Sequence, residues 1–269
     1  QPKADASRIE WRGATTYMAQ MTEQVPATAE AAEQTECPRC GKIAPLCVCA
    51  DIEPFETRVS LVILQHPQEQ DKALGTARLA ALHFKDAVVK IGLSWASLSK
   101  ILGYTADPQR WAILYLGSAR AEELAPDRDL VVLDKKGQAE ARQGAVLREL
   151  EGVIVLDGTW SQAKALWWRN AWMLKCRRVL LNPSQPSRYG NLRKEARRDG
   201  LSTIESTAML MSRIEGRPEI EQSLLESFSR LLDRYRAIRK TTPGFDRDAG
   251  SKRLKRLGQA KSMRRRRFR

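Results

Sequence analysis

Short runs of β-branched and other aliphatic residues alternate with helix-like stretches between residues 57 and 182. β-branched side chains favour strands, and strands that alternate with helical stretches are typical of βαβ units joined by crossover helices. We therefore predict an α/β fold with a mostly parallel sheet and helices on both faces. The expected strands are 58–65, 86–91, 111–116, 130–133, 152–157 and 177–181, and the expected helices lie near 68–83, 94–101, 138–150, 161–170, 202–212 and 217–239.

Four cysteines are crowded into one short segment, CPRCGKIAPLCVCAD, ahead of the first expected strand. A C-x-x-C pair followed by C-x-C can place four thiolates around one ion, and Zn²⁺ accepts four sulfur ligands in a tetrahedron. An iron–sulfur cluster would use the same ligands, and two disulfides are a weaker alternative because the spacings are tight. We predict a closed, structural zinc site formed by Cys37, Cys40, Cys47 and Cys49.

The positive charge of the chain is concentrated near its end. The net charge is +14, and residues 250–269 contain ten Lys or Arg and no acid. Such a block repels itself and favours a polyanionic partner, because clustered Arg neutralises phosphates with release of counterions. We expect a disordered tail that contacts RNA through Arg264, Arg265, Arg266 and Arg267. A merely solubilising tail is the main alternative, and contact with an acidic membrane surface is a lesser one.

These features divide the chain into four predicted parts. They are a flexible leader (1–35), a four-cysteine zinc-binding module (36–56), an α/β domain (57–242) and a basic tail (243–269). No run of about 18 apolar residues is present, so no helix is expected to span a membrane. The first residues do not have the basic start and apolar block of a secretory signal. We therefore expect a cytoplasmic protein without a membrane partner.

The segment VIVLDGTWSQAKALWWRN places polar residues directly after an apolar strand. Ligands bind at the carboxyl ends of strands in α/β sheets, where Asp157 and Gly158 are expected. Gly158 lets the backbone pass close to a ligand, and Trp160 offers a flat face for stacking on a base. Asp157 is the one acid of this segment placed for proton chemistry, although an Asp at a strand–helix turn commonly just caps the helix.

Five blocks of the chain, in order, resemble the DTW-domain family, the tRNA-uridine aminocarboxypropyltransferases. The family's Asp-x-Thr-Trp motif matches Asp157, Thr159 and Trp160, and its C-x-x-C…C-x-C cluster matches the four cysteines. A lone DGTW would be weak evidence, whereas five ordered blocks between about 37 and 212 are specific. The other blocks are a His-Pro-x-Glu and Thr-x-Arg element (His66, Pro67, Glu69, Thr76, Arg78), the pair Arg193 and Lys194, and LSTIES from Leu201 to Ser206.

This resemblance implies a fold and a reaction. The fold is expected to be similar to the SPOUT class of RNA-modifying enzymes, with a knotted C-terminal half. S-adenosylmethionine is the expected co-substrate and tRNA the expected partner. The product would be 3-(3-amino-3-carboxypropyl)uridine, with methylthioadenosine released. Whether the protein is a monomer or a homodimer is left open, as are the target uridine and the tRNAs chosen.

Roles for individual residues follow from the reaction. N3 of uridine is a weak acid that needs a base within hydrogen-bond reach, and we expect Asp157 to be that base or to orient the substrate. We place Thr159 and Trp160 beside it in the catalytic set. The expected cofactor-binding residues are Leu116, Gly117, Ser118, Asp157, Gly158, Thr159, Ser202, Thr203 and Glu205. The expected RNA-binding residues, besides the tail, are His66, Arg78, Arg188, Arg193 and Lys194.

Structural roles compete with several of these assignments. Ser202 and Glu205 have the spacing of a capping box, which would explain both without a cofactor. Glu69 and Arg78 can pair across a helix start. Two other functions are kept as alternatives: an RNA methyltransferase that uses the same co-substrate, and a zinc-ribbon RNA-binding protein without catalysis.

Overall fold

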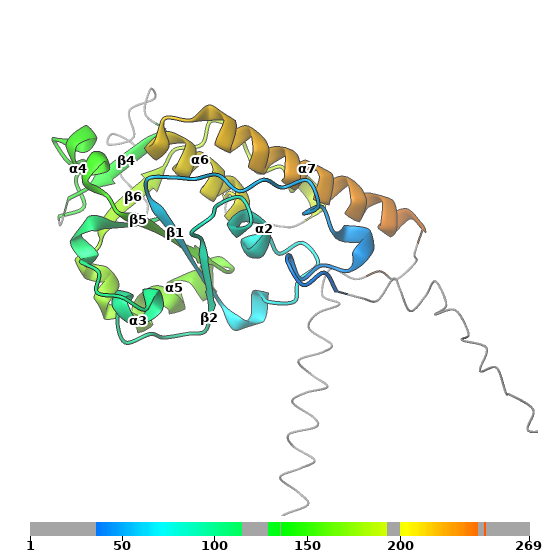
Figure 1. The fold of residues 1–269 in the computed structure, drawn as a ribbon, viewed down its shortest axis with the longest axis horizontal. Helices are drawn as coiled ribbons and strands as arrows, with labels where there is room; N and C mark the ends of the chain where they lie inside the picture. The colour runs from blue at the N-terminus through cyan, green and yellow to red at the C-terminus, as the bar shows by residue number, and fades with distance from the viewer. Residues whose placement is uncertain (1–35, 115–128, 135, 193–199, 242–244, 246–269) are drawn as a thin grey trace, which may run out of the picture.

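Six strands form one sheet in the order β2-β1-β5-β3-β6-β4 (Figure 1). The computed structural model describes residues 36–114, 129–134, 136–192, 200–241 and 245. Five strands run parallel, and β4 alone is antiparallel, to β6, which confirms the predicted mostly parallel sheet. The strands are β1 (Ser60–Gln65), β2 (Val88–Ile91), β3 (Trp111–Leu114), β4 (Leu130–Leu133), β5 (Gly152–Asp157) and β6 (Arg177–Leu181).

Alternate residues of the strands face two separate layers of helices. On β1, Leu61 and Ile63 pack with residues of α2, α6 and α7, whereas Val62 and Leu64 pack with residues of α3 and α5. The side-chain period of two in a strand therefore covers both faces of the sheet. The helices are α2 (Ala77–Ala81), α3 (Leu98–Leu102), α4 (Gln143–Glu149), α5 (Trp160–Arg169), α6 (Thr203–Glu215) and α7 (Pro218–Thr241).

Helix α6 lies between the sheet and α7 (Figure 1). It is buried on nearly all sides, which is unusual for a helix and explains its apolar and small residues, TIESTAMLMSRIE. Gly216 ends it in the left-handed conformation, with φ of 67°, and α7 begins two residues later. Contacts with β5 and β6 hold α6 against the middle of the sheet.

The predicted helix over residues 68–83 is wrong in its first half. A 3₁₀ turn, η2 (Pro67–Glu69), follows β1, and only Ala77–Ala81 is α-helical. The backbone between them turns: Gly75 N donates to the carbonyl oxygen of Lys72, which also accepts from Lys42 Nζ at 2.7 Å. Contacts from a distant segment have therefore overridden the local helix preference of this stretch.

Most other predicted bounds differ from the structure by a few residues. Strand β1 begins at Ser60 rather than at 58, because the backbone N–H groups of Arg58 and Val59 donate to the carboxylate of Glu215 at 3.2 and 3.0 Å. The helix predicted at 94–101 begins at Leu98, where Ser97 Oγ caps it by accepting from Lys100 N. The helix predicted at 138–150 forms only over Gln143–Glu149.

The cysteine-containing segment packs onto this domain rather than standing apart. Leu46, Val48 and Ile52 belong to the same buried cluster as α6 and α7. The predicted leader and nearly all of the basic tail lie outside the described residues. No helix among the described residues is long and apolar enough to cross a bilayer. The knot implied by the resemblance stays a prediction.

Candidate functional site

Asp157 ends β5 directly opposite Gln65, which ends β1. Gln65 Nε2 donates to Asp157 Oδ2 at 2.7 Å. Thr203 Oγ1, from the first residue of α6, donates to the other oxygen, Oδ1. Asp157 is only 6% exposed. Three segments far apart in the sequence therefore hold one nearly buried carboxylate at the carboxyl ends of adjacent parallel strands.

The start of α2 belongs to the same cluster. Thr76, the N-cap of α2, accepts a hydrogen bond from the backbone N–H of Ile204 at 3.2 Å through its Oγ1. Thr76 is buried, as is Ile204. The Thr-x-Arg element is thus joined to the first turn of α6, one residue from the threonine that holds Asp157.

A capping box stabilises the start of α6. Ser202 Oγ accepts from Glu205 N at 3.3 Å, and Glu205 Oε2 accepts from Ser202 N at 2.8 Å. The same carboxylate also accepts from Ser187 Oγ and Arg188 N, both at 2.7 Å. Glu205 is therefore surrounded by donors from the protein itself, and it ties the Pro-rich loop to the helix.

His66 and the start of α5 form one side of the site. His66 N donates to the carbonyl oxygen of Asp157 at 2.9 Å, and His66 Nδ1 accepts from Gln68 N at 3.2 Å. Gln162 links the two segments, because its Nε2 donates to Gln68 Oε1 and its Oε1 accepts from Thr159 N. Partial burial lowers the pKa of His66, so the ring stays neutral and Nδ1 stays an acceptor near pH 7.

Gly158 and Trp160 flank Asp157 and Thr159 at this turn. A Cβ added to Gly158 would lie 2.8 Å from Gln162 Cβ, so the close packing of the turn on α5 requires glycine. Trp160 is 37% exposed and leaves part of its ring open to solvent. The turn accordingly offers an apolar surface beside a buried acid.

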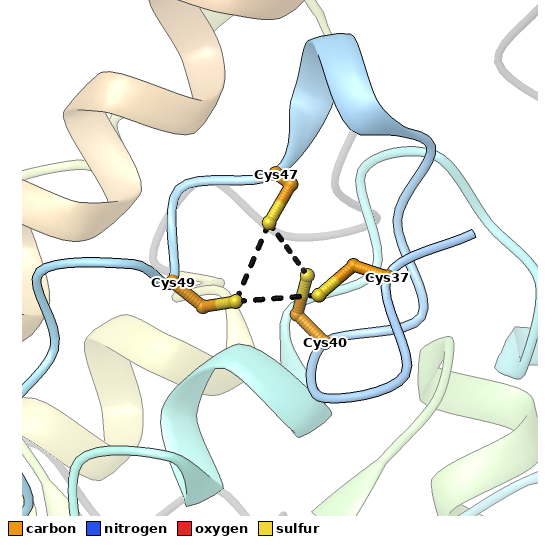
Figure 2. A group of neighbouring side chains, drawn as sticks. All are labelled: Cys37, Cys40, Cys47 and Cys49. Atoms are coloured by element: carbon orange, nitrogen blue, oxygen red, sulfur yellow. Dashed lines mark hydrogen bonds between the residues drawn. The ribbon is translucent and has the colours of Figure 1, made fainter. Parts of the chain in front are cut away.

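The four predicted metal ligands converge, as Figure 2 shows. Their Sγ atoms all lie within 4.8 Å of one another, with pairs at 3.3, 3.5 and 3.6 Å. All four cysteines are free, so the disulfide alternative is wrong. Thiolates about 2.3 Å from a tetrahedral zinc ion are about 3.8 Å apart, so the arrangement fits one ion with little adjustment.

The thiols of the cluster differ in their environments. Backbone N–H groups, that of Cys40 foremost, lower the pKa of Cys37 to about 6. Burial raises the pKa of Cys40 to about 11 and raises the pKa of Cys49 as well. Without a cation, at least two of these buried thiols would stay protonated at neutral pH. A bound metal ion would deprotonate them, as it does in closed thiolate sites.

The predicted zinc-binding module, residues 36–56 and from here on called the metal module, contacts the segment that leads into α2. Lys42 Nζ donates to the carbonyl oxygen of Lys72, and the guanidinium of Arg78 lies against Gly41, where an added Cβ would be 2.6 Å from Nη1. Glu69 pairs with Lys72 at 2.7 Å, so the predicted Glu69–Arg78 pair is wrong. Arg78 contacts the metal module instead.

The remaining predicted residues divide into two groups. Arg188 lies near the site, with its backbone on Glu205 and its Nη1 donating to Ser229 Oγ on α7 at 2.8 Å. The others lie outside the described residues: Leu116, Gly117, Ser118, Arg193, Lys194, Arg264, Arg265, Arg266 and Arg267.

Three residues of the site were missed by the sequence analysis: Gln65, Gln68 and Gln162. Gln65 ends a strand that pairs with the strand of Asp157, and Gln162 is the third residue of the helix that Thr159 caps. The sequence feature that could have identified Gln65 as a site residue is its position at the end of an expected strand, just before the His-Pro element. Its contact with Asp157 depends on the strand order, which the sequence did not reveal.

The fold and the site together define an α/β protein with a buried acid at the carboxyl ends of its strands and a cluster of four cysteines that could hold a metal ion. Comparison of the sequence with models of known protein families identifies the family. The DTW domain model matches residues 34–236, and the chain belongs to that family.

Curated relatives carry the name tRNA-uridine aminocarboxypropyltransferase 2. Those of Macaca fascicularis and Mus musculus are 29% and 28% identical over 206 residues, which cover 75% of this chain and 63% of each relative. That of Drosophila melanogaster is 30% identical over 196 residues, 71% of either chain. The chain thus spans about 63% of the length of the two mammalian relatives. No solved structure matches the chain.

Proposed function

We propose that this protein is a tRNA-uridine aminocarboxypropyltransferase, which transfers the 3-amino-3-carboxypropyl group of S-adenosylmethionine to N3 of a uridine in tRNA. The observation that carries the proposal is the carboxylate of Asp157, held by Gln65 and Thr203 at the ends of β5 and β1 and the start of α6. Ligands of open α/β sheets bind at this edge. Membership of the DTW family and the name of the curated relatives support the same reaction.

The residues around Asp157 fit the amino-acid part of S-adenosylmethionine. Gln65 Oε1 is a buried acceptor without a hydrogen-bond donor among the described residues, and it adjoins a carboxylate. An acceptor of this kind needs an N–H group, and an ammonium supplies one. We assign Asp157, Gly158, Thr159, Ser202 and Thr203 to the co-substrate, together with Leu116, Gly117 and Ser118, which lie outside the described residues. Glu205 acts on it through the start of α6.

In this proposal Asp157 receives the proton of uridine N3. When bound, the sulfonium supplies an electrophilic carbon: the N3–carbon bond forms, the carbon–sulfur bond breaks, and methylthioadenosine leaves as a neutral thioether. The N3 proton passes to the carboxylate of Asp157, which completes the balance. Trp160 stacks on the target base or on the adenine, and a target in a tRNA loop is favoured because N3 must be unpaired.

We infer supporting roles for the rest of the chain. The four-cysteine module holds a structural zinc ion, the domain over 57–242 adopts a SPOUT-like, knotted fold, and the protein acts in the cytoplasm. His66, Arg78, Arg188, Arg193, Lys194 and the basic tail contact RNA. The zinc ion takes no part in the reaction, because four protein ligands leave no open position for substrate.

The test is to incubate the purified protein with S-adenosylmethionine and an unmodified tRNA transcript and to weigh the nucleosides after digestion. A uridine heavier by one aminocarboxypropyl group is expected, and Asp157→Asn should abolish it, whereas the exposed control Asp86→Asn should not. A methylated nucleoside would replace the proposal by an RNA methyltransferase. No product and no binding of S-adenosylmethionine would leave a metal-bearing RNA-binding protein.

A further inference from the structure

A groove runs between the metal module and the edge strand β2, with a volume of about 720 Å³. We propose that this groove, with Arg39, Arg78 and Lys85 on its walls, binds the sugar–phosphate backbone of the substrate RNA. The inference rests on the proposed function, because it takes RNA as the substrate. It gives the metal module a second role, as one wall of an RNA-binding surface, here named the basic groove.

The walls of the basic groove come from three parts of the chain. Arg39 and Pro54 come from the metal module, Arg78 from α2, and Lys85 from the turn after α2. None of the described residues that line the groove is acidic. Three cations on a lining that contains no acid favour a positive potential, which attracts a polyanion, although Lys85 is paired with Glu56 outside the lining.

Arg78 is the central cation of the basic groove. Arg78 is half-buried and its guanidinium lies against Gly41, and no described residue forms an ion pair or a side-chain hydrogen bond with it. A partly buried guanidinium without an anion costs desolvation energy that a phosphate would offset, because Arg binds phosphate with two parallel hydrogen bonds. The groove thus holds a cation that no described residue neutralises.

Arg39 and Lys85 are more exposed. Arg39 Nη1 donates to the carbonyl oxygen of Cys49 at 2.9 Å, which directs the side chain without neutralising it. Lys85 forms an ion pair with Glu56, and both side chains are exposed, at 52% and 77%. A surface pair of this kind contributes little stability and can open to a phosphate at low cost.

The helix that carries Arg78 begins at the candidate active site. Thr76, which accepts from Ile204 N next to Thr203, lies two residues before Arg78 on the same short helix. Two residues separate points on a chain by no more than about 7 Å. Arg78 therefore lies near the residue that contacts the first turn of α6, and in this proposal the groove positions the strand that carries the target uridine.

The experiment compares two double variants that each remove one Arg and one Lys. Arg39→Gln with Lys85→Gln changes the basic groove. Arg148→Gln with Lys100→Gln is the matched control, because both residues lie far from the groove. Arg148 is on α4, beside β4 at the opposite edge of the sheet from β2. Lys100 is on α3, which covers the opposite face of the sheet from α2. Both are made in the full, metal-loaded chain, with metal content and melting temperature measured first. The single variants Arg78→Gln and Arg78→Lys are tested alongside.

Binding of an unmodified tRNA transcript is measured by fluorescence anisotropy between 50 and 250 mM salt, and product formation by nucleoside mass spectrometry. The groove variant is expected to bind about tenfold more weakly, with a salt slope reduced by about 1.5 because two phosphate contacts are lost. KM for tRNA should rise with kcat unchanged, since these contacts are the same in the ground and transition states. Arg78→Lys should retain more binding than Arg78→Gln.

The possible results distinguish failure of the groove from failure of the proposed reaction. The basic groove is not an RNA site if both double variants bind equally well, and product formation by the wild type would then leave the proposed function standing. Equal competition by polyglutamate would assign the groove to an acidic protein instead. A wild type that binds tRNA through the groove but makes no product would support the groove and reject the reaction. Failure of the wild type to bind tRNA would reject both.

Discussion

Gln65 donates its side-chain amide to Asp157 Oδ2 at 2.7 Å across the paired ends of β1 and β5. The contact joins the residue before the His-Pro element to the acid of the DGTW motif. Two of the sequence blocks that resemble the DTW family thus meet in one hydrogen-bonded cluster. The proposed mechanism depends on this cluster, because a base is effective only when its orientation is fixed.

Gln65→Leu should reduce product formation by roughly 10- to 100-fold, because a hydrogen bond to a charged group contributes about 1.5–3 kcal/mol. The loss arises from a carboxylate that turns away from the substrate. Gln222→Leu, a substitution on the outer helix α7, is the matched control. Single-turnover rates with bound tRNA measure the effect. An unchanged rate would show that Gln65 does not position Asp157.

Thr203→Val should slow the same step, because it removes the hydroxyl that donates to Asp157 Oδ1 and keeps the side-chain shape. Thr203→Ser restores the hydroxyl and should recover most of the rate. The double variant with Gln65→Leu should lose less than the product of the two single losses, since both side chains act on one carboxylate. Fully multiplicative losses would mean that the two residues act separately.

The metal module should carry one zinc ion per chain, detected by elemental analysis of the purified protein. Cys40→Ser should lose the ion and lower the melting temperature by at least about 5 °C, because metal binding stabilises the folded module. Activity should fall as well, because the module supports the segment that leads into the site: Lys42 contacts Lys72, before α2, and Gly41 contacts Arg78, within α2. Cys176→Ser, a buried cysteine outside the cluster, should keep the zinc ion. Iron with a visible absorption band would contradict the assignment.

Stability should decrease as the pH falls below about 6.5. His83 is fully buried, with Nδ1 against the carbonyl oxygen of Leu79 and Nε2 against Ser227 Oγ, and burial lowers its pKa. The unfolded chain therefore binds a proton at a higher pH than the folded chain does. Stability is fully present above the unfolded pKa and falls by up to about 1.4 kcal/mol per pH unit until the folded pKa is reached.

Urea denaturation at pH 7.5, 6.5 and 5.5 measures this dependence. His83→Gln should be less stable at pH 7.5 and should depend less on pH. The chain has only two histidines, and the pKa of His66 is also lowered, so His66→Gln serves as the comparison and should keep most of the dependence. A wild type with constant stability across this range would contradict the account of His83.

The sequence predicted the sheet better than the connections around the site. The bounds of β4, β5 and β6 were predicted residue for residue, because the aliphatic residues of each strand stop at a polar residue, Asp134, Asp157 or Asn182. The segment after β1 was not, because its turns depend on Lys42, about 30 residues away, and on Tyr189, which donates to the carbonyl oxygen of Leu74. Local patterns do not contain such long-range contacts.

For the candidate site, the sequence identified the reactive residues but not the residues that orient them. Asp157, Thr203 and the four cysteines were identified from motifs, and the structure brings each set together. Gln65 and the pairing of Lys72 with Glu69 were not identified, since both depend on how distant segments or turns pack. Motifs identify the reactive group, whereas the residues that orient it follow from the topology.

The most direct test of the proposed reaction follows the carbon that is transferred. Two preparations of S-adenosylmethionine are needed, one labelled in the methyl group and one labelled in the carbons of the amino-acid arm, each with an unmodified tRNA transcript. We predict that the modified uridine carries the arm label and no methyl label, and that Asp157→Asn yields neither. A nucleoside that carries only the methyl label would contradict the account and identify a methyltransferase.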